Sequence, residues 1–113
     1  MSLQREIKLR AVFASELVKY EAESSSLKKW YYLERLHIVG QSYLILHLKT
    51  HWLMLNLAGE EAKVAEVLGQ LFRLLLAIPG HILNRLPIGN VGTSRVSAFQ
   101  RMEVPKDLQE LLK

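Results

Sequence analysis

The strongest constraint on the fold is a short polar break, Gly40-Gln41-Ser42, between two segments that carry potential metal ligands at helical spacing. Glu34 and His37 precede the break at spacing i, i+3, and His47 and His51 follow it at spacing i, i+4. Each spacing puts both side chains on one face of an α-helix. If the chain reverses at the break, an antiparallel hairpin sets His37 beside His47 and Glu34 beside His51.

Apolar periodicity predicts four long helices. The first has an apolar stripe without glycine or proline, and the serine run 24–26 that ends it offers an N-cap for the second. Gly59 is expected just beyond the third helix, and Pro79-Gly80 is expected to end the fourth. The predicted helices run from about Leu3 to Glu23, Leu27 to Val39, Tyr43 to Ala58 and Glu60 to Ile78.

The fourth helix has one narrow polar stripe, formed by Lys63, Glu66, Gln70 and Arg73. The rest of its surface is apolar, which predicts that this helix is deeply packed. The third helix is also apolar around most of its circumference. That pattern is compatible with burial in a homodimer interface.

Beyond Gly80 the composition changes to that of a loop, from Pro87 to Ser94. The stretch 96–99 is expected to cross the helices in extended form, with Val96 and Phe99 as anchors. Pro105 is expected to open a short final helix, because proline is favoured at the first helical position. The predicted fold is a single all-α domain over residues 1–113: a four-helix core of two antiparallel hairpins, a C-terminal extended wrap and a short terminal helix.

Composition excludes several classes of site. The chain has no cysteine, so disulfides, thiolate metal sites and iron–sulfur clusters are excluded. The first residues are charged too early for a secretion signal. Uncharged runs such as Leu36 to Leu48 are shorter than the ~20 residues that span a bilayer. A cytoplasmic protein without a membrane segment is therefore expected.

The net charge of +4 comes from one region. No acidic residue occurs between Val67 and Met102, a stretch that holds four arginines and no lysine. Arginine suits pairing with carboxylates or phosphates. Because no aromatic residues are interleaved with these arginines, the pattern is a poor indication of nucleic-acid binding. We instead expect the segment to dock on the helices, with at least one of Arg85, Arg95 and Arg101 paired with a glutamate.

The ligand types at the hairpin suit a divalent transition metal. The faces that carry them are mainly apolar and should look inward, and buried polar groups must be hydrogen-bonded or bound to something. Three imidazoles and one carboxylate would fill a tetrahedral zinc site, and they also suit iron, cobalt or nickel. The candidate metal ligands are Glu34, His37, His47 and His51. Gln41 could hold one imidazole from outside.

Two other readings stay open. In the first, Glu34 accepts hydrogen bonds from the histidines in a metal-free core network, and the protein is a helical protein–protein interaction module. In the second, an enzyme uses the metal as a Lewis acid, which needs an open coordination position. No catalytic residue is indicated. His81, after Pro79-Gly80, is expected at the surface or as a cap.

Three blocks of sequence resemble a known bacterial family, a domain of unknown function numbered 3703. They are Leu33 to Gln41, the His47-x3-His51-Trp52-x-Met54-Leu55 segment, and Arg85 to Asn90 with Val96 to Phe99. The resemblance implies a compact all-helical cytosolic protein. It implies no activity, because the family has no established one.

Overall fold

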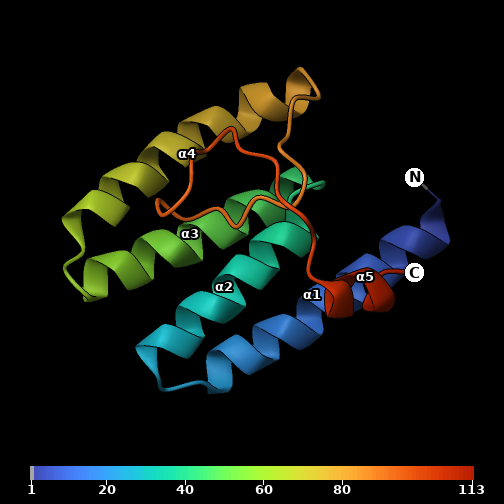
Figure 1. Cartoon of the computed structure of the whole chain (residues 1–113), viewed down its shortest axis with the longest axis horizontal. Coiled ribbons are helices and arrows are strands. Elements are labelled where there is room, and N and C mark those ends of the chain that lie inside the picture. Colours follow the sequence, from blue (N-terminus) through green and yellow to red (C-terminus); the bar gives the residue numbers. More distant parts are fainter. Residues whose placement is uncertain (1) are drawn as a thin grey trace.

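The computed structural model describes residues 2–113, and within this range it contains five helices and no strand. Each long helix packs against the next along the chain (Figure 1). Helices α1 and α2 form one antiparallel hairpin and α3 and α4 a second, which confirms the predicted all-α fold. The helices are α1 (Leu3–Ala22), α2 (Ser26–Gly40), α3 (Leu44–Glu60), α4 (Val64–Ile82) and α5 (Lys106–Leu111).

Serine caps set the starts of the first hairpin's helices. The Ser2 hydroxyl accepts from the backbone N–H of Arg5, and the Ser25 hydroxyl from that of Lys28. These contacts satisfy backbone donors that a helix leaves free in its first turn. At the other end of α2, Gly40 lies so close to α1 that a Cβ there would be 2.8 Å from the Phe13 ring. Glycine at this position therefore lets the two helices approach.

The predicted boundaries of the second hairpin were wrong by several residues. α3 continues through Gly59, and the turn is made by Ala62, whose φ of 54° lies in the left-handed region. α4 does not end at Pro79-Gly80 but runs to Ile82. Proline costs a helix one hydrogen bond and a clash one turn back, and a single remaining turn tolerates this. The extra turn brings His81 onto α4.

The prediction that α4 is deeply packed was also wrong, because part of its polar stripe faces inward and much of its apolar surface is exposed. Gln70 and Arg73 are buried, whereas many apolar side chains of α4 are exposed. The reason is the C-terminal segment, which lies over this polar stripe: Arg73 donates to the carbonyls of Thr93 and Val96. The exposed side chains are Val64, Leu68, Leu71, Phe72, Leu75, Ile78 and Ile82.

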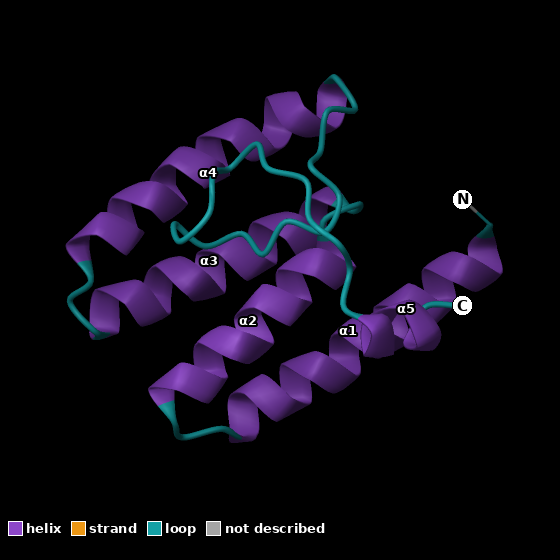
Figure 2. Cartoon of the chain, viewed as in Figure 1, coloured by secondary structure: helices purple, strands orange, loops and turns teal. Residues whose placement is uncertain are grey.

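The C-terminal segment crosses the helices as a loop before α5 packs beside α1 (Figure 2). Arg95 makes a two-point contact with Glu34 of α2, with N–O distances of 2.8 and 2.9 Å, which confirms the predicted docking of an arginine from this stretch. Val96 is half-buried, but Phe99 is 69% exposed, so the prediction of a buried anchor at Phe99 was wrong. Pro105 caps the final helix.

The apolar core lies between α1, α2 and α3, and Leu108 of α5 closes it. Beside it, Arg35 donates two hydrogen bonds to the buried carboxylate of Glu16 and pairs with Asp107, joining α2 to α1 and α5. Within residues 2–113 we find no helix long and apolar enough to cross a membrane. The core residues are Leu9, Phe13, Leu33, Leu36, Val39, Met54, Leu57 and Leu108.

Candidate metal centre

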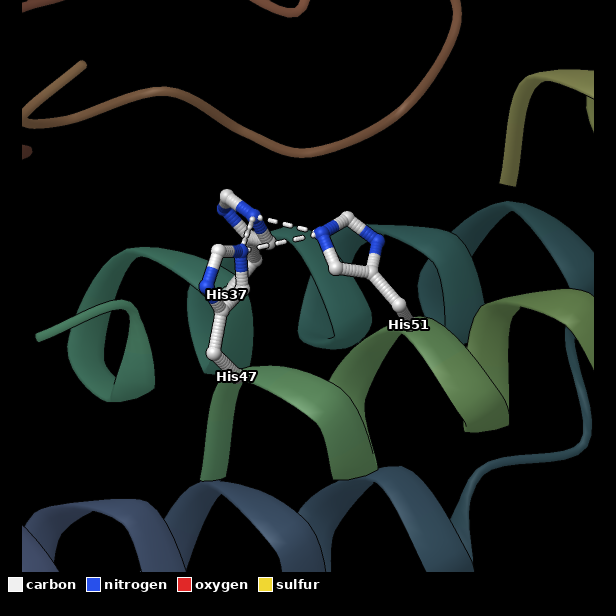
Figure 3. A group of neighbouring side chains, drawn as sticks. All are labelled: His37, His47 and His51. Atoms are coloured by element: carbon white, nitrogen blue, oxygen red, sulfur yellow. Dashed lines mark hydrogen bonds between the residues drawn. The ribbon is translucent and has the colours of Figure 1, made fainter. Parts of the chain in front are cut away.

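Three histidines meet between α2 and α3. His37 projects from α2 and His47 and His51 from successive turns of α3, so that their rings converge (Figure 3). The three Nε2 atoms lie 3.0–3.1 Å from one another. We call these three residues the histidine cluster. The helical spacing and the chain reversal at Gly40-Gln41-Ser42 therefore place His37 beside His47 as predicted.

The cluster is buried and uncharged. Its members are 2–6% exposed. Burial and the neighbouring rings of His51 and His47 lower the pKa of His37 well below its ordinary value. Burial together with nearby histidines lowers the pKa of His47 to about 3, and burial is also the main cause that lowers the pKa of His51 to about 4. Near neutral pH all three rings are therefore neutral imidazoles, the form that binds metals.

Outer hydrogen bonds fix the protonation of two rings. His37 Nδ1 lies 2.7 Å from the backbone carbonyl of Asn90, which can only accept. His51 Nδ1 lies 2.6 Å from Gln70 Oε1. The orientation of that amide is set because Gln70 Nε2 donates to Glu66 and to the carbonyl of Gly92. Both Nδ1 atoms must therefore carry the proton, which leaves a lone pair on each Nε2.

The third ring has a histidine partner. His47 Nδ1 lies 3.0 Å from Nε2 of His81, so one of these two nitrogens donates to the other. If His81 donates, His47 Nε2–H supplies a single proton to the cluster. The contact between His37 and His51 then still sets one lone pair against another at 3.1 Å. If His47 donates, all three Nε2 atoms present lone pairs, and no proton lies among them.

Such convergence of lone pairs is the geometry of a cation site. Zinc–imidazole bonds are about 2.0–2.1 Å long, which puts two nitrogens of a tetrahedral ion about 3.3–3.4 Å apart. Each pair in the cluster would have to separate by only about 0.3 Å to reach that spacing. A ligating histidine usually donates its other ring N–H to an outer acceptor, as His37 does to a backbone carbonyl and His51 to an amide oxygen.

The structure does not place Glu34 with the histidine cluster. Its carboxylate accepts from Arg95 and, at 2.5 Å, from the Thr93 hydroxyl. Described residues that could jointly hold an ion there are the three histidines alone. The predicted pairing of Glu34 with His51 is thus corrected. Gln41 does not hold an imidazole either, because its amide donates to the carbonyl of Pro87.

Residues that the sequence did not single out complete the surroundings. The turn at Gly92, with φ of 84°, packs directly on His37, since a Cβ there would lie 2.4 Å from Cδ2 of the ring. The buried Asn90 side chain holds this turn through the Gly92 N–H and the carbonyls of Ser97 and Gln100. In the sequence, the only indication of this turn was the glycine and asparagine content of the loop from Gly89 to Ser94. His81 lies in the last turn of α4, half-buried beside His47, a contact that the expected surface or capping role did not include.

A cavity of about 310 Å³ opens beside the cluster and is lined by all three of its rings. α4 and the C-terminal segment supply most of the remaining wall. The cluster is therefore accessible from one side, although each of its side chains is almost fully covered.

Comparison with known proteins adds a family and no activity. A search of curated proteins finds no match, and neither does a search of solved structures. A family model described as "Protein of unknown function (DUF3703)" matches residues 7–112, a range that includes the whole histidine cluster, its outer partners and the cavity wall. The chain therefore belongs to this family of unknown function, DUF3703.

Proposed function

We propose that this protein binds one divalent transition-metal ion through Nε2 of His37, His47 and His51. The observation that carries the proposal is the contact of His37 with His51, whose Nε2 atoms lie 3.1 Å apart while the hydrogen bond at each Nδ1 assigns the ring proton to Nδ1. Two facing lone pairs repel, and a cation between them turns the repulsion into two bonds. Metal handling by a helical hairpin is the function that this geometry supports best.

The donor set narrows the class of ion. Three neutral imidazoles without a thiolate or carboxylate suit borderline ions such as zinc, cobalt, nickel or copper(II), and do not suit magnesium or calcium, which take oxygen ligands. Zinc is the reference ion for the proposal, because three histidines with a fourth exchangeable ligand form a familiar zinc arrangement. Cobalt(II) provides a coloured substitute with similar coordination.

The metal-free core network is the competing reading. It keeps the histidine cluster as a set of buried hydrogen-bonding groups and needs no ion. In its best form His81 donates to Nδ1 of His47, and the Nε2–H of His47 is shared between its contacts with His37 and His51. The contact between His37 and His51 then holds no proton. The two readings differ in a simple respect: only a metal site makes stability depend on added zinc.

The test is a zinc competition titration of the purified chain against a chromogenic chelator. Binding of one ion per chain is expected, with loss of stoichiometric binding on His37→Ala, His47→Ala or His51→Ala. Melting curves with zinc and with a chelator accompany the titration, because an ion that binds only the folded state raises its stability by mass action. An unaltered melting temperature in zinc would refute the metal site and leave the core network.

Glu34→Gln is the matched control. It removes the carboxylate charge of the fourth residue in the ligand set expected from sequence. The Arg95 side chain that pairs with Glu34 is 58% exposed. With three histidine ligands this variant binds zinc with unchanged stoichiometry. Loss of binding in Glu34→Gln together with the histidine variants would instead restore the four-ligand site.

A second candidate function rests on the outer face of α4. Leu68, Leu75 and Ile82 are each more than 60% exposed on one helix, and contiguous apolar patches of this kind are typical of interaction surfaces. This observation supports a helical interaction module, with a second copy of the chain as its partner, a homodimer that the apolar third helix also led us to expect. Sedimentation equilibrium of the chain and of Leu75→Lys tests it: a dimer that dissociates in the variant supports the module, and a monomer at all concentrations opposes a dimer.

A further inference from the structure

The cavity beside the histidine cluster has an apolar wall with two arginines and no acidic residue. Its volume of about 310 Å³ is that of a small ligand site. Besides the cluster, its polar lining comprises Gln41, Asn90, Arg73 and Arg85. The apolar lining includes Leu76, Leu86 and Phe99.

Neither amide side chain on this wall is free to complete the coordination of an ion in the cluster. The Gln41 amide is bonded to the carbonyl of Pro87, and the Asn90 side chain to three backbone groups of its own loop. Three histidines therefore leave at least one coordination position unfilled, and the cavity is the space next to them. Sites with three protein ligands and such a position bind an exchangeable ligand.

The charges around the cavity select an anion. An ion in the cluster adds positive charge to a wall that already holds two arginines. The Arg73 guanidinium donates to the carbonyls of Thr93, Val96 and Gly69. Arg85 differs, because its guanidinium has no hydrogen-bond or ion-pair partner among residues 2–113. It is exposed and lines the cavity, so it is placed to meet a ligand there.

We propose that the cavity binds a small carboxylate with an apolar chain. One carboxylate oxygen occupies the open position of the metal, Arg85 pairs with the carboxylate, and the chain lies against Leu76, Leu86 and Phe99. An arginine fork suits carboxylate geometry, and the apolar wall disfavours small hydrated anions. The inference rests on the proposed metal site and extends it to an exchangeable organic ligand.

The experiment uses the full chain loaded with cobalt(II), whose visible absorption bands change when a ligand joins or replaces one in its coordination shell. Sodium butyrate is titrated into the loaded protein, with sodium formate and butyramide as probes that lack the apolar chain and the charge, respectively. Butyrate is expected to change the bands in a saturable way, and the two comparison probes to bind at least about tenfold more weakly.

Arg85→Ala should weaken butyrate binding about tenfold while cobalt binding stays unchanged. Arg101→Ala is the matched control, because Arg101 is an exposed arginine of the same segment that does not line the cavity. Equal loss in both variants would reduce the effect to net charge and overturn the role of Arg85. Formate binding as tightly as butyrate would overturn the apolar subsite.

The two proposals fail in distinguishable ways. Cobalt bands that form in full but do not respond to butyrate refute the carboxylate site and leave the metal site standing. Absence of any cobalt band in the wild-type chain refutes the metal site, and the carboxylate inference with it.

Discussion

Replacing Gly92 with alanine should damage the histidine cluster from outside it. The new Cβ would lie 2.4 Å from Cδ2 and 2.5 Å from Cγ of the His37 ring, where carbon atoms normally keep about 3.5 Å or more. The ring must therefore move by about 1 Å. Gly92 also has φ of 84°, a region that costs an L-residue roughly 1–2 kcal/mol.

The two effects together predict a loss of about 2–4 kcal/mol in the free energy of unfolding, because His37 is almost fully buried and the overpacked site has little room to relax. A displacement of one of three ligands should also lower zinc affinity by about 10–100-fold. Urea unfolding in the presence of a chelator measures the first quantity, and competition with a chromogenic chelator measures the second.

Gly59→Ala is the matched control. Gly59 lies inside α3, and a Cβ there meets nothing within 4 Å. This change should leave zinc affinity unaltered and raise stability by up to about 1 kcal/mol, since alanine is the better helix former. The reasoning is refuted if Gly92→Ala keeps wild-type zinc affinity although the variant is folded and destabilised, because His37 would then not be needed at its observed position.

Three further predictions concern the surroundings of the cluster. With a chelator present, the free energy of unfolding should fall as pH drops below about 6.5, by up to about 1.4 kcal/mol per pH unit for each clustered histidine. The unfolded chain binds protons in this range, whereas the folded rings do not, because two of them have pKa values of about 3 and about 4. Urea midpoints between pH 7 and pH 4.5 check this, and a flat profile would contradict it. Gln70→Ala should weaken zinc binding about 10–100-fold whereas Gln41→Ala should not, because only Gln70 bonds to an imidazole; equal titration curves for the two variants would oppose this. Glu16→Ala should cost about 3–5 kcal/mol in urea unfolding, equally with zinc and with chelator, because it leaves the buried Arg35 without its main partner; a cost that depends on zinc would show that this pair is coupled to the metal site.

Local periodicity was enough to predict the hairpin and the meeting of its histidines. The i, i+3 and i, i+4 spacings fix which faces carry the side chains, and the polar break fixes the reversal. Glu34 shares the α2 face with His37 and was assigned to the same site on that ground. Its actual partner, Arg95, lies far along the chain, and spacing within a hairpin says nothing about a segment that docks later.

The deep packing predicted for α4 was wrong for a related reason. A helix with one polar stripe normally turns that stripe to water. Here the polar stripe bonds the backbone of the C-terminal segment, with Gln70 on Gly92 and Arg73 on Thr93 and Val96. The binary pattern of polar and apolar residues cannot distinguish a solvated stripe from one that holds a loop. The same docking places Asn90 and Gln70 behind the imidazoles.

X-ray absorption at the zinc edge of the loaded protein tests the central claim most directly. It reports the atoms bound to the ion and recognises imidazole by the scattering of its outer ring atoms. Three imidazole nitrogens at about 2.0–2.1 Å are expected, with one or more light ligands beside them. A shell made only of oxygen ligands, without ring scattering, would contradict it, because the ion would then be bound outside the histidine cluster.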